Sequence, residues 1–227
     1  MKKIISIMML MIISLSVYAN DIYINQSGAT LDLDVLQDGQ NNTIGSSGTA
    51  SSVIGATTNL AITQIGDSNV MTFDVNGATY TGTFSVTGNS NNIDFNCDSQ
   101  GTNSSCGTAT ASIVWVGSSN DIDIDIGETS SATSATVGIT GASGSDSNTI
   151  LGTIDGNSAI LTLSVNGDTN NFLIDIDGNG DSAGHTYIHT HTGSIADVDI
   201  TQSGIYDNMI TLTTSGDNHD IDIIQRD

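Results

Sequence analysis

Residues 61–77 read AITQIGDSNVMTFDVNG, and this stretch decides the fold. Apolar residues alternate with polar ones on both sides of a short turn, GDSN. Alternation with a period of two predicts β-strands, because successive side chains of a strand point to opposite faces. The stretch is therefore a strand–turn–strand unit, and two amide side chains, Gln64 and Asn69, stand at the shoulders of its turn.

The same unit recurs along the chain, with a turn of the pattern Gly-x-x-Asn and two copies that contain one additional residue. The copies are Gly39/Asn42, Gly66/Asn69, Gly88/Asn91, Gly117/Asn120 and Gly167/Asn170, with the longer forms Gly144/Asn148 and Gly204/Asn208. Successive asparagines lie 22 to 29 residues apart up to Asn170, and 38 residues separate Asn170 from Asn208. One unit cannot bury its apolar face alone, but stacked units can. The sequence therefore predicts an all-β protein, a β-solenoid of stacked strand–turn–strand repeats.

Stacking gives the amide side chains a role. Equivalent residues of successive coils lie above one another, so each Asn or Gln can bond to the amides above and below it in a ladder. Such a ladder satisfies polar groups whose burial would otherwise be costly. The expected ladder and turn residues are Gln26, Gln37, Gly39, Asn42, Gln64, Gly66, Asn69, Gly88, Asn91, Gly117, Asn120, Asn148, Gly167, Asn170, Gln202, Gly204, Asn208 and Gln225.

The composition is strongly acidic. The 227 residues include 3 Lys and Arg against 25 Asp and Glu, which gives a net charge of −22, and there is no proline. Phosphate contacts need Lys and Arg, so nucleic acid and anionic lipid are poor partners. Aspartates alternate with apolar residues, as in DIDIDI at 121–126, so they should face water in rows that repel one another. Assembly should then be slow at pH 8 in low salt and faster near pH 4 or with calcium.

The first residues have the layout of a secretory signal peptide. Lys2 and Lys3 precede an apolar run, and a small-residue cleavage site ends at Ala19. The alternative is a membrane anchor, for which the run is short. We expect a signal peptide at 1–19 and one repeat domain at 20–227, with insertions near 97–107 and 178–194. The protein should be exported, and it should not be an integral membrane protein.

Two cysteines bracket the first insertion. Cys97 and Cys106 enclose a polar segment, DSQGTNSS. In an exported protein, cysteines this close are expected to form a disulfide. The alternative is a pair of free thiols or a metal pair.

The second insertion contains three histidines of one parity. His189 and His191 could chelate a transition metal together with His185 or Asp181, or the histidines could lie on an exposed polar strand. The nearby DIDGNGD resembles the start of a calcium loop, but Ser182 replaces the glycine and no glutamate closes it. We therefore assign no metal, no cofactor and no catalytic residue, and we expect the protein not to be an enzyme.

A family resemblance follows from two stretches of the repeat. QDGQNNTI at 37–44 and QIGDSNVMTFDV at 64–75 resemble the curlin repeat, Gln-x-Gly-x-x-Asn followed by alternating small or apolar residues. QSG recurs at Gln26 and Gln202, and Gln225 lies near the end of the chain. Curlins are the secreted subunits of curli, the extracellular amyloid fibres of Gram-negative bacteria.

The resemblance covers most of 20–227, and it implies export through an outer-membrane pore and fibre assembly at the cell surface. The central repeats depart from the curlin pattern, because Val86, Trp115 and Val165 replace the first glutamine.

The sequence thus predicts a secreted structural subunit of a curli-like fibre that assembles with other copies or related subunits and serves cell adhesion and biofilm matrix. The alternative is a non-polymerising β-solenoid adhesin or binding module, of which an ice-binding solenoid is one form. DIYINQSG and DIDIIQRD, at the two ends of the repeat region, read as repeat-like strands without a helical or proline cap. Uncapped ends favour polymerisation, because a monomeric solenoid needs protected edges.

Overall fold

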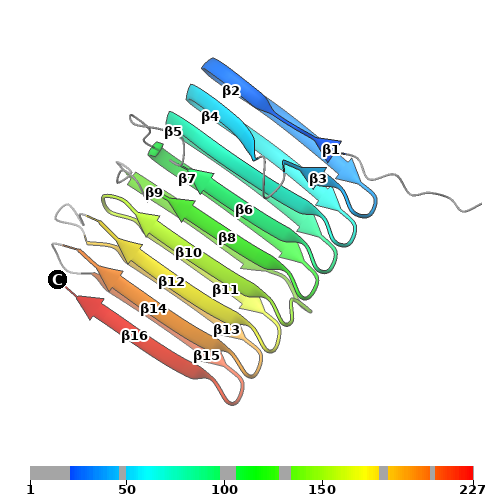
Figure 1. Ribbon diagram of the computed structural model, residues 1–227. Helices are drawn as coiled ribbons and strands as arrows, with labels where there is room; N and C mark the ends of the chain where they lie inside the picture. The colour runs from blue at the N-terminus through cyan, green and yellow to red at the C-terminus, as the bar shows by residue number, and fades with distance from the viewer. Residues whose placement is uncertain are drawn as a thin grey trace, which may run out of the picture.

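The computed structural model describes residues 21–45, 50–97, 106–127, 134–178, 184–204 and 208–226. Within these ranges the chain is all-β, with no helix, and its parallel strands stack as a β-solenoid of about seven turns (Figure 1). The predicted fold class is therefore confirmed.

The strands are β1 (Asp21–Ile22), β2 (Asn25–Asp38), β3 (Thr43–Ile44), β4 (Ser51–Ile65), β5 (Val70–Thr87), β6 (Asn92–Cys97), β7 (Cys106–Val116), β8 (Asp121–Ile126), β9 (Ser134–Gly141), β10 (Thr149–Asp155), β11 (Ile160–Asn166), β12 (Asn171–Asp177), β13 (Thr186–Thr192), β14 (Asp197–Ser203), β15 (Met209–Ser215) and β16 (Asp220–Arg226).

All strands belong to one hydrogen-bonded sheet, which folds over into two facing layers. Layer 1 contains β1, β3, β6, β8, β10, β12, β14 and β16 together with the first residues of β2, β4 and β5. Layer 2 contains β7, β9, β11, β13 and β15 together with the remaining residues of β2, β4 and β5. The Gly-x-x-Asn turns carry the chain from layer 2 to layer 1.

The core lies between the two layers. Each strand pairs with the equivalent strand of the next turn residue by residue, so that inward side chains stack in rows. Ile122, Ile124 and Ile126 of β8 are buried, whereas the aspartates between them face outward. The predicted outward orientation of the aspartates is thus observed.

One core position shows how closely the rows fit. Trp115 is fully buried, and its indole occupies the space beside Gly141, its register partner on the next turn. A Cβ on Gly141 would overlap the indole. The large and the small residue fill one site together.

The two expected insertions differ in their outcome. In the first, Cys97 and Cys106 are joined by a disulfide, with a Cα–Cα distance of 5.5 Å. The predicted disulfide fits an oxidising, non-cytoplasmic environment. The segment between the two cysteines, and the expected signal peptide, lie outside the described residues.

The second segment, 178–194, is for the most part not an insertion. β13 lies within it and pairs in register with β11 on one side and β15 on the other, as in any other turn of the solenoid. Residues 179–183 lie outside the described ranges. No helix in the described part of the chain is long and apolar enough to cross a membrane.

Trp115→Ala should lower the free energy of unfolding by about 3–5 kcal/mol, because it leaves a large cavity in a close-packed core. Val114→Ala is the matched control: Val114 is the neighbouring residue of the same strand, and its side chain faces outward. It should change stability by about 0.5 kcal/mol or less. Urea unfolding of freshly purified protein measures both values, and equal effects would contradict the assigned core face.

Candidate functional site

The Gly-x-x-Asn turns have a backbone that requires glycine. Gly39, Gly66, Gly88 and Gly117 have φ between 131° and 135°, a region that L side chains rarely adopt. A Cβ on Gly66 would also overlap the carbonyl oxygen of Gly39 on the preceding turn. The residue before each asparagine has left-handed φ, for example 61° at Ser68. Both features allow successive turns to stack at the strand spacing.

The asparagines of these turns form one continuous ladder. The backbone N–H of Asn42 donates to Oδ1 of Asn69 at 2.8 Å, and the N–H of Asn69 donates to Oδ1 of Asn91 at 2.8 Å. The same bond links the following pairs: Asn91 to Asn120 at 2.9 Å, Asn120 to Asn148 at 2.8 Å, and Asn148 to Asn170 at 3.0 Å. All these asparagines are buried.

The ladder differs in chemistry from a stack of amides bonded to one another. Its repeating bond runs from backbone to side chain, and the Nδ2 groups of Asn42, Asn69 and Asn170 donate to the glycine carbonyl three residues earlier. Bonds between amide side chains occur from Asn120 to Asn148 at 3.2 Å and from Asn148 to Asn170 at 3.1 Å. Asn42, Asn69 and Asn170 therefore each close their own turn. Every asparagine of the ladder from Asn69 to Asn170 accepts a bond from the preceding turn.

The glutamine row is much shorter. Nε2 of Gln64 donates to Oε1 of Gln37 at 2.9 Å. The next position in this row is Val86, which cannot continue the ladder, and Oε1 of Gln64 is buried without a hydrogen-bond partner. The row goes on through Trp115, Gly141, Val165, His191 and Thr214.

The other predicted residues belong to the opposite turn. Gln26, Gln202 and Gln225 share one row of layer 1, and apolar residues and Cys97 fill the positions between Gln26 and Gln202. Gly204 and Asn208 also lie at this turn, not in a Gly-x-x-Asn turn. Oδ1 of Asn208 accepts a bond from the N–H of His185 at 2.9 Å.

Sequence reasoning missed the last two turns of the main ladder. They are Gly193–Ala196 and Gly216–His219, and both glycines have the same backbone as the earlier ones, with φ of 143° and 138°. Nδ1 of His219 accepts the N–H of Ala196 at 3.3 Å, in the place of an asparagine oxygen. The regular spacing could have revealed both turns, but the asparagine that marks the others is absent. At Asn148, similarly, Ser145 takes the place that glycine has elsewhere, and Gly144 precedes it.

Three histidines point into the core: His189 and His191 belong to β13, and His185 directly precedes it. His185, His189 and His191 are fully buried. The His189 ring packs against Phe172 with centroids 4.6 Å apart, and Nε2 of His191 donates to the carbonyl of Gly167 at 2.8 Å. The predicted alternative, in which the histidines lie on an exposed polar strand, is therefore wrong. No group of three metal-ligating side chains is found in the described residues, which exclude Asn179 and Asp181.

Burial controls the protonation of these histidines. Loss of hydration and, to a smaller extent, the neighbouring His191 together lower the pKa of His189 to about 3. Burial also lowers the pKa values of His185 and His191, although Asp177 near His185 and Asp168 near His191 oppose the shift. The last turns of the solenoid therefore hold neutral imidazoles at pH 7.

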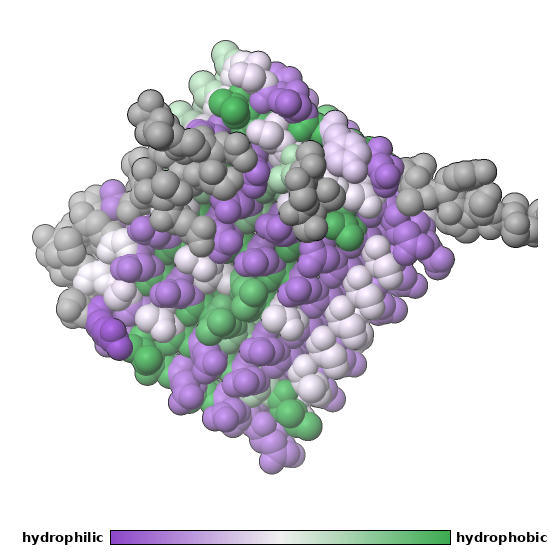
Figure 2. Space-filling model, viewed as in Figure 1, coloured by the Kyte–Doolittle hydropathy of each residue, from purple (hydrophilic) through white to green (hydrophobic). Residues whose placement is uncertain are grey.

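The outward face of layer 1 carries the acids, and hydrophilic side chains cover much of the face in Figure 2. Asp94 pairs in register with Asp123, and Asp199 pairs with Asp222. Burial, followed by the charge of Asp74, raises the pKa of Asp94. Burial, followed by the charges of neighbouring aspartates, also raises the pKa values of Asp175 and Asp199. Asp175 and Asp177 face solvent.

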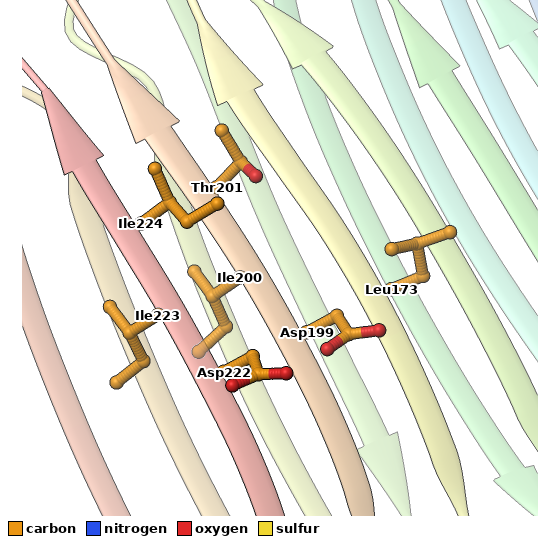
Figure 3. Close-up of a pocket in the computed structure, with 7 residues that line it drawn as sticks. All are labelled: Leu173, Asp199, Ile200, Thr201, Asp222, Ile223 and Ile224. Atoms are coloured by element: carbon orange, nitrogen blue, oxygen red, sulfur yellow. The ribbon is translucent and has the colours of Figure 1, made fainter.

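A shallow groove of about 500 Å³ lies on this face near the C-terminal edge (Figure 3). It is lined by Leu173, Asp199, Ile200, Thr201, Asp222, Ile223 and Ile224. The described residues that line it offer two adjacent carboxylates but no imidazole, thiol or amine. The groove is therefore best understood as part of the open end of the stack.

Comparison of the chain with protein-family models, with curated proteins and with solved structures finds no match. The site must therefore be interpreted from its own geometry.

Asn170→Ala should destabilise the protein by about 1–3 kcal/mol, because it leaves the buried N–H of Asn148 without an acceptor. Asn171→Ala is the matched control, since Asn171 is the next residue and its side chain is exposed. It should have little effect. Thermal unfolding of the two variants, measured side by side, checks this, and equal losses of stability would count against the ladder.

Acid should weaken the C-terminal turns first. With folded-state pKa values below the ordinary value of about 6.5, the histidines stabilise the fold fully above pH 6.5, and this stability is lost as the pH falls toward 3. Lowering the pH from 7.5 to 5 should therefore increase corrected hydrogen-exchange rates in 184–226 more than in 57–97, which contains no histidine. His189→Leu should reduce the difference. A uniform change along the chain would contradict the prediction.

Proposed function

We propose that this protein is a structural subunit that assembles end to end into an extracellular fibre of the curli type, serving cell adhesion and the biofilm matrix. The observation that carries the proposal is that both ends of the described stack are open. At each end, a strand pairs on one side only, and residues of the inward rows are exposed to solvent.

At the C-terminal end, β16 pairs with β14 and leaves its other edge unpaired. Ile221 and Ile223 continue the inward rows, yet they are 37% and 46% exposed. In layer 2, Ile210 and Leu212 of β15 also continue inward rows and are only half-buried. An unpaired edge of this kind is a template for another strand.

The N-terminal end presents the complementary surface. Ile22 and Ile24 in layer 1, and Leu31, Leu33 and Val35 in layer 2, are partly buried hydrophobic residues packed against the core. Their rows are the same rows that end at the opposite side of the stack. A second copy can therefore continue the rows without a change of register, and such head-to-tail contacts generate filaments rather than closed oligomers.

Charge should set the rate of this assembly. Without the expected signal peptide, which contains Lys2 and Lys3, each added copy has one Arg against 25 Asp and Glu, a net charge of −24, so the copies repel one another at low ionic strength. Salt screens this repulsion over about 10 Å at 0.1 M. Acid acts in two opposed directions, because it neutralises the aspartates but also weakens the histidine-containing turns. The fastest assembly should therefore lie at mildly acidic pH.

Three features support export: the expected signal peptide, the disulfide, and the resemblance to curlins, which also implies an outer-membrane secretion pore. The second candidate function, a non-polymerising adhesin, requires ends that resist edge pairing. The described ends lack a cap of either helix or proline, so the fibre is the better supported function.

Leu212→Asp should abolish seeded fibre elongation, because it places a charge in an inward row of the docking surface. Thr213→Asp is the matched control, since it adds the same charge to the adjacent residue, whose side chain faces outward. It should elongate at nearly the wild-type rate. The measurement is elongation from fixed wild-type seeds, after circular dichroism has shown that both variants are folded.

Wild-type protein that stays monomeric for days at tens of micromolar would exclude the fibre and favour the adhesin. Equal elongation by Leu212→Asp and the wild type would exclude assembly through the open end.

A further inference from the structure

The two layers of the stack differ by one strand. Layer 1 begins with residues 21–28 and ends with β16, whereas layer 2 begins with residues 30–38 and ends with β15. Because the described residues begin and end in layer 1, that layer contains one described strand more than layer 2. This asymmetry limits how two copies can join.

Layer 2 of one copy can continue directly into layer 2 of the next. β15 would then pair with residues 30–38 of the incoming copy, with Ile210 beside Leu33 and Leu212 beside Val35. This arrangement leaves only one place in layer 1 between β14 and the strand level of the incoming copy that contains β3 and the first residues of β4. Two strands are available for it, β16 of the first copy and residues 21–28 of the second.

Retaining both strands has a structural cost. The incoming copy would be displaced by one strand spacing, and one strand position of layer 2 would stay empty. The backbone groups on both sides of that gap would lack partners, and the core beneath it would be exposed. A joint in which one strand replaces the other avoids the gap.

The two competing strands present the same side chains to the core. In residues 21–28 the inward residues are Ile22, Ile24 and Gln26. In β16 the residues of the same three rows are Ile221, Ile223 and Gln225. The inward triplet Ile, Ile, Gln occurs in these two terminal strands and in no other described strand of layer 1. Either strand can therefore fill the same place.

Two observations favour the incoming strand over β16. Gln202 is fully buried, and both polar atoms of its amide lack a partner, because Nε2 of its row neighbour Gln225 donates instead to the carbonyl of Asn208. β16 also places Asp222 beside Asp199, whereas the incoming strand would place Tyr23 there.

We propose that copies join by strand exchange, in which residues 21–28 of an incoming copy displace β16 and pair with β14. The proposal rests on the proposed end-to-end assembly. Gln26 then lies beside Gln202, Tyr23 replaces Asp222 in the acidic row, and both layers continue without a gap. The released β16 leaves the stack with its turn.

The test uses two substitutions of the same residue type in the same row. Ile24→Asp should slow elongation from wild-type seeds about tenfold or more, because the incoming strand must enter the core. Ile223→Asp weakens a strand that has to leave, so it should elongate as fast as the wild type or faster. Equal slowing by both variants would overturn strand exchange while leaving end-to-end assembly intact. Wild-type protein that forms no fibre would remove the proposed function itself.

A second measurement does not depend on how well the Ile24→Asp variant folds. Gln202→Cys combined with Gln225→Cys places two cysteines at register partners on β14 and β16, which an oxidant can join. The oxidised double variant should not elongate at its C-terminal end, whereas each oxidised single variant should. Elongation by the locked double variant at the wild-type rate would overturn the proposal.

Discussion

The hydrogen bond from the backbone N–H of one turn to the Asn side-chain oxygen of the next is the interaction on which the rest of the structure depends. It repeats from Asn42 to Asn170 with lengths of 2.8 to 3.0 Å. The bond satisfies the buried backbone donors of Asn42, Asn69, Asn91, Asn120 and Asn148, and a shift by one residue would break it. The apolar rows, the glycine turns and the outward aspartates are all aligned by this register.

The register also separates charge from neutral surface. The aspartates of layer 1 project outward in rows, and several lie directly beside one another on adjacent turns. From residue 57 onward, the strands of layer 2 contain no acidic or basic residue except the inward histidines of β13. The repulsion that opposes assembly is therefore concentrated on one face along most of the stack, although Asp32, Asp34 and Asp38 lie on the outward face of β2 at its N-terminal end. The inward rows at the two ends consist mainly of apolar residues and amides.

Much of this was predictable from local pattern. The alternation of apolar and polar residues predicted the strands, and the Gly-x-x-Asn spacing predicted the turns up to Asn170. The short distance between the two cysteines in the sequence predicted the disulfide. The orientation of β13 was not predictable, because its aliphatic residue, Ile188, lies on the outward face with the threonines, whereas tyrosine and histidine face the core. The register partners of β13 determine which of its side chains face the core: His189 lies beside Leu163, and His191 lies beside Val165. The role of Ala196 and His219 likewise depends on their place in the stack, since neither residue type marks a turn.

The central claim is that the solenoid of one chain continues into the next along a single axis, and mass per unit length of unstained fibres tests it most directly. With about eight strand levels per copy at roughly 4.8 Å each, the account predicts one chain per about 38 Å of each filament. A fibre in which every chain occupied a single flat layer would contain one chain per roughly 4.8 Å. That higher value would contradict end-to-end stacking of folded solenoids.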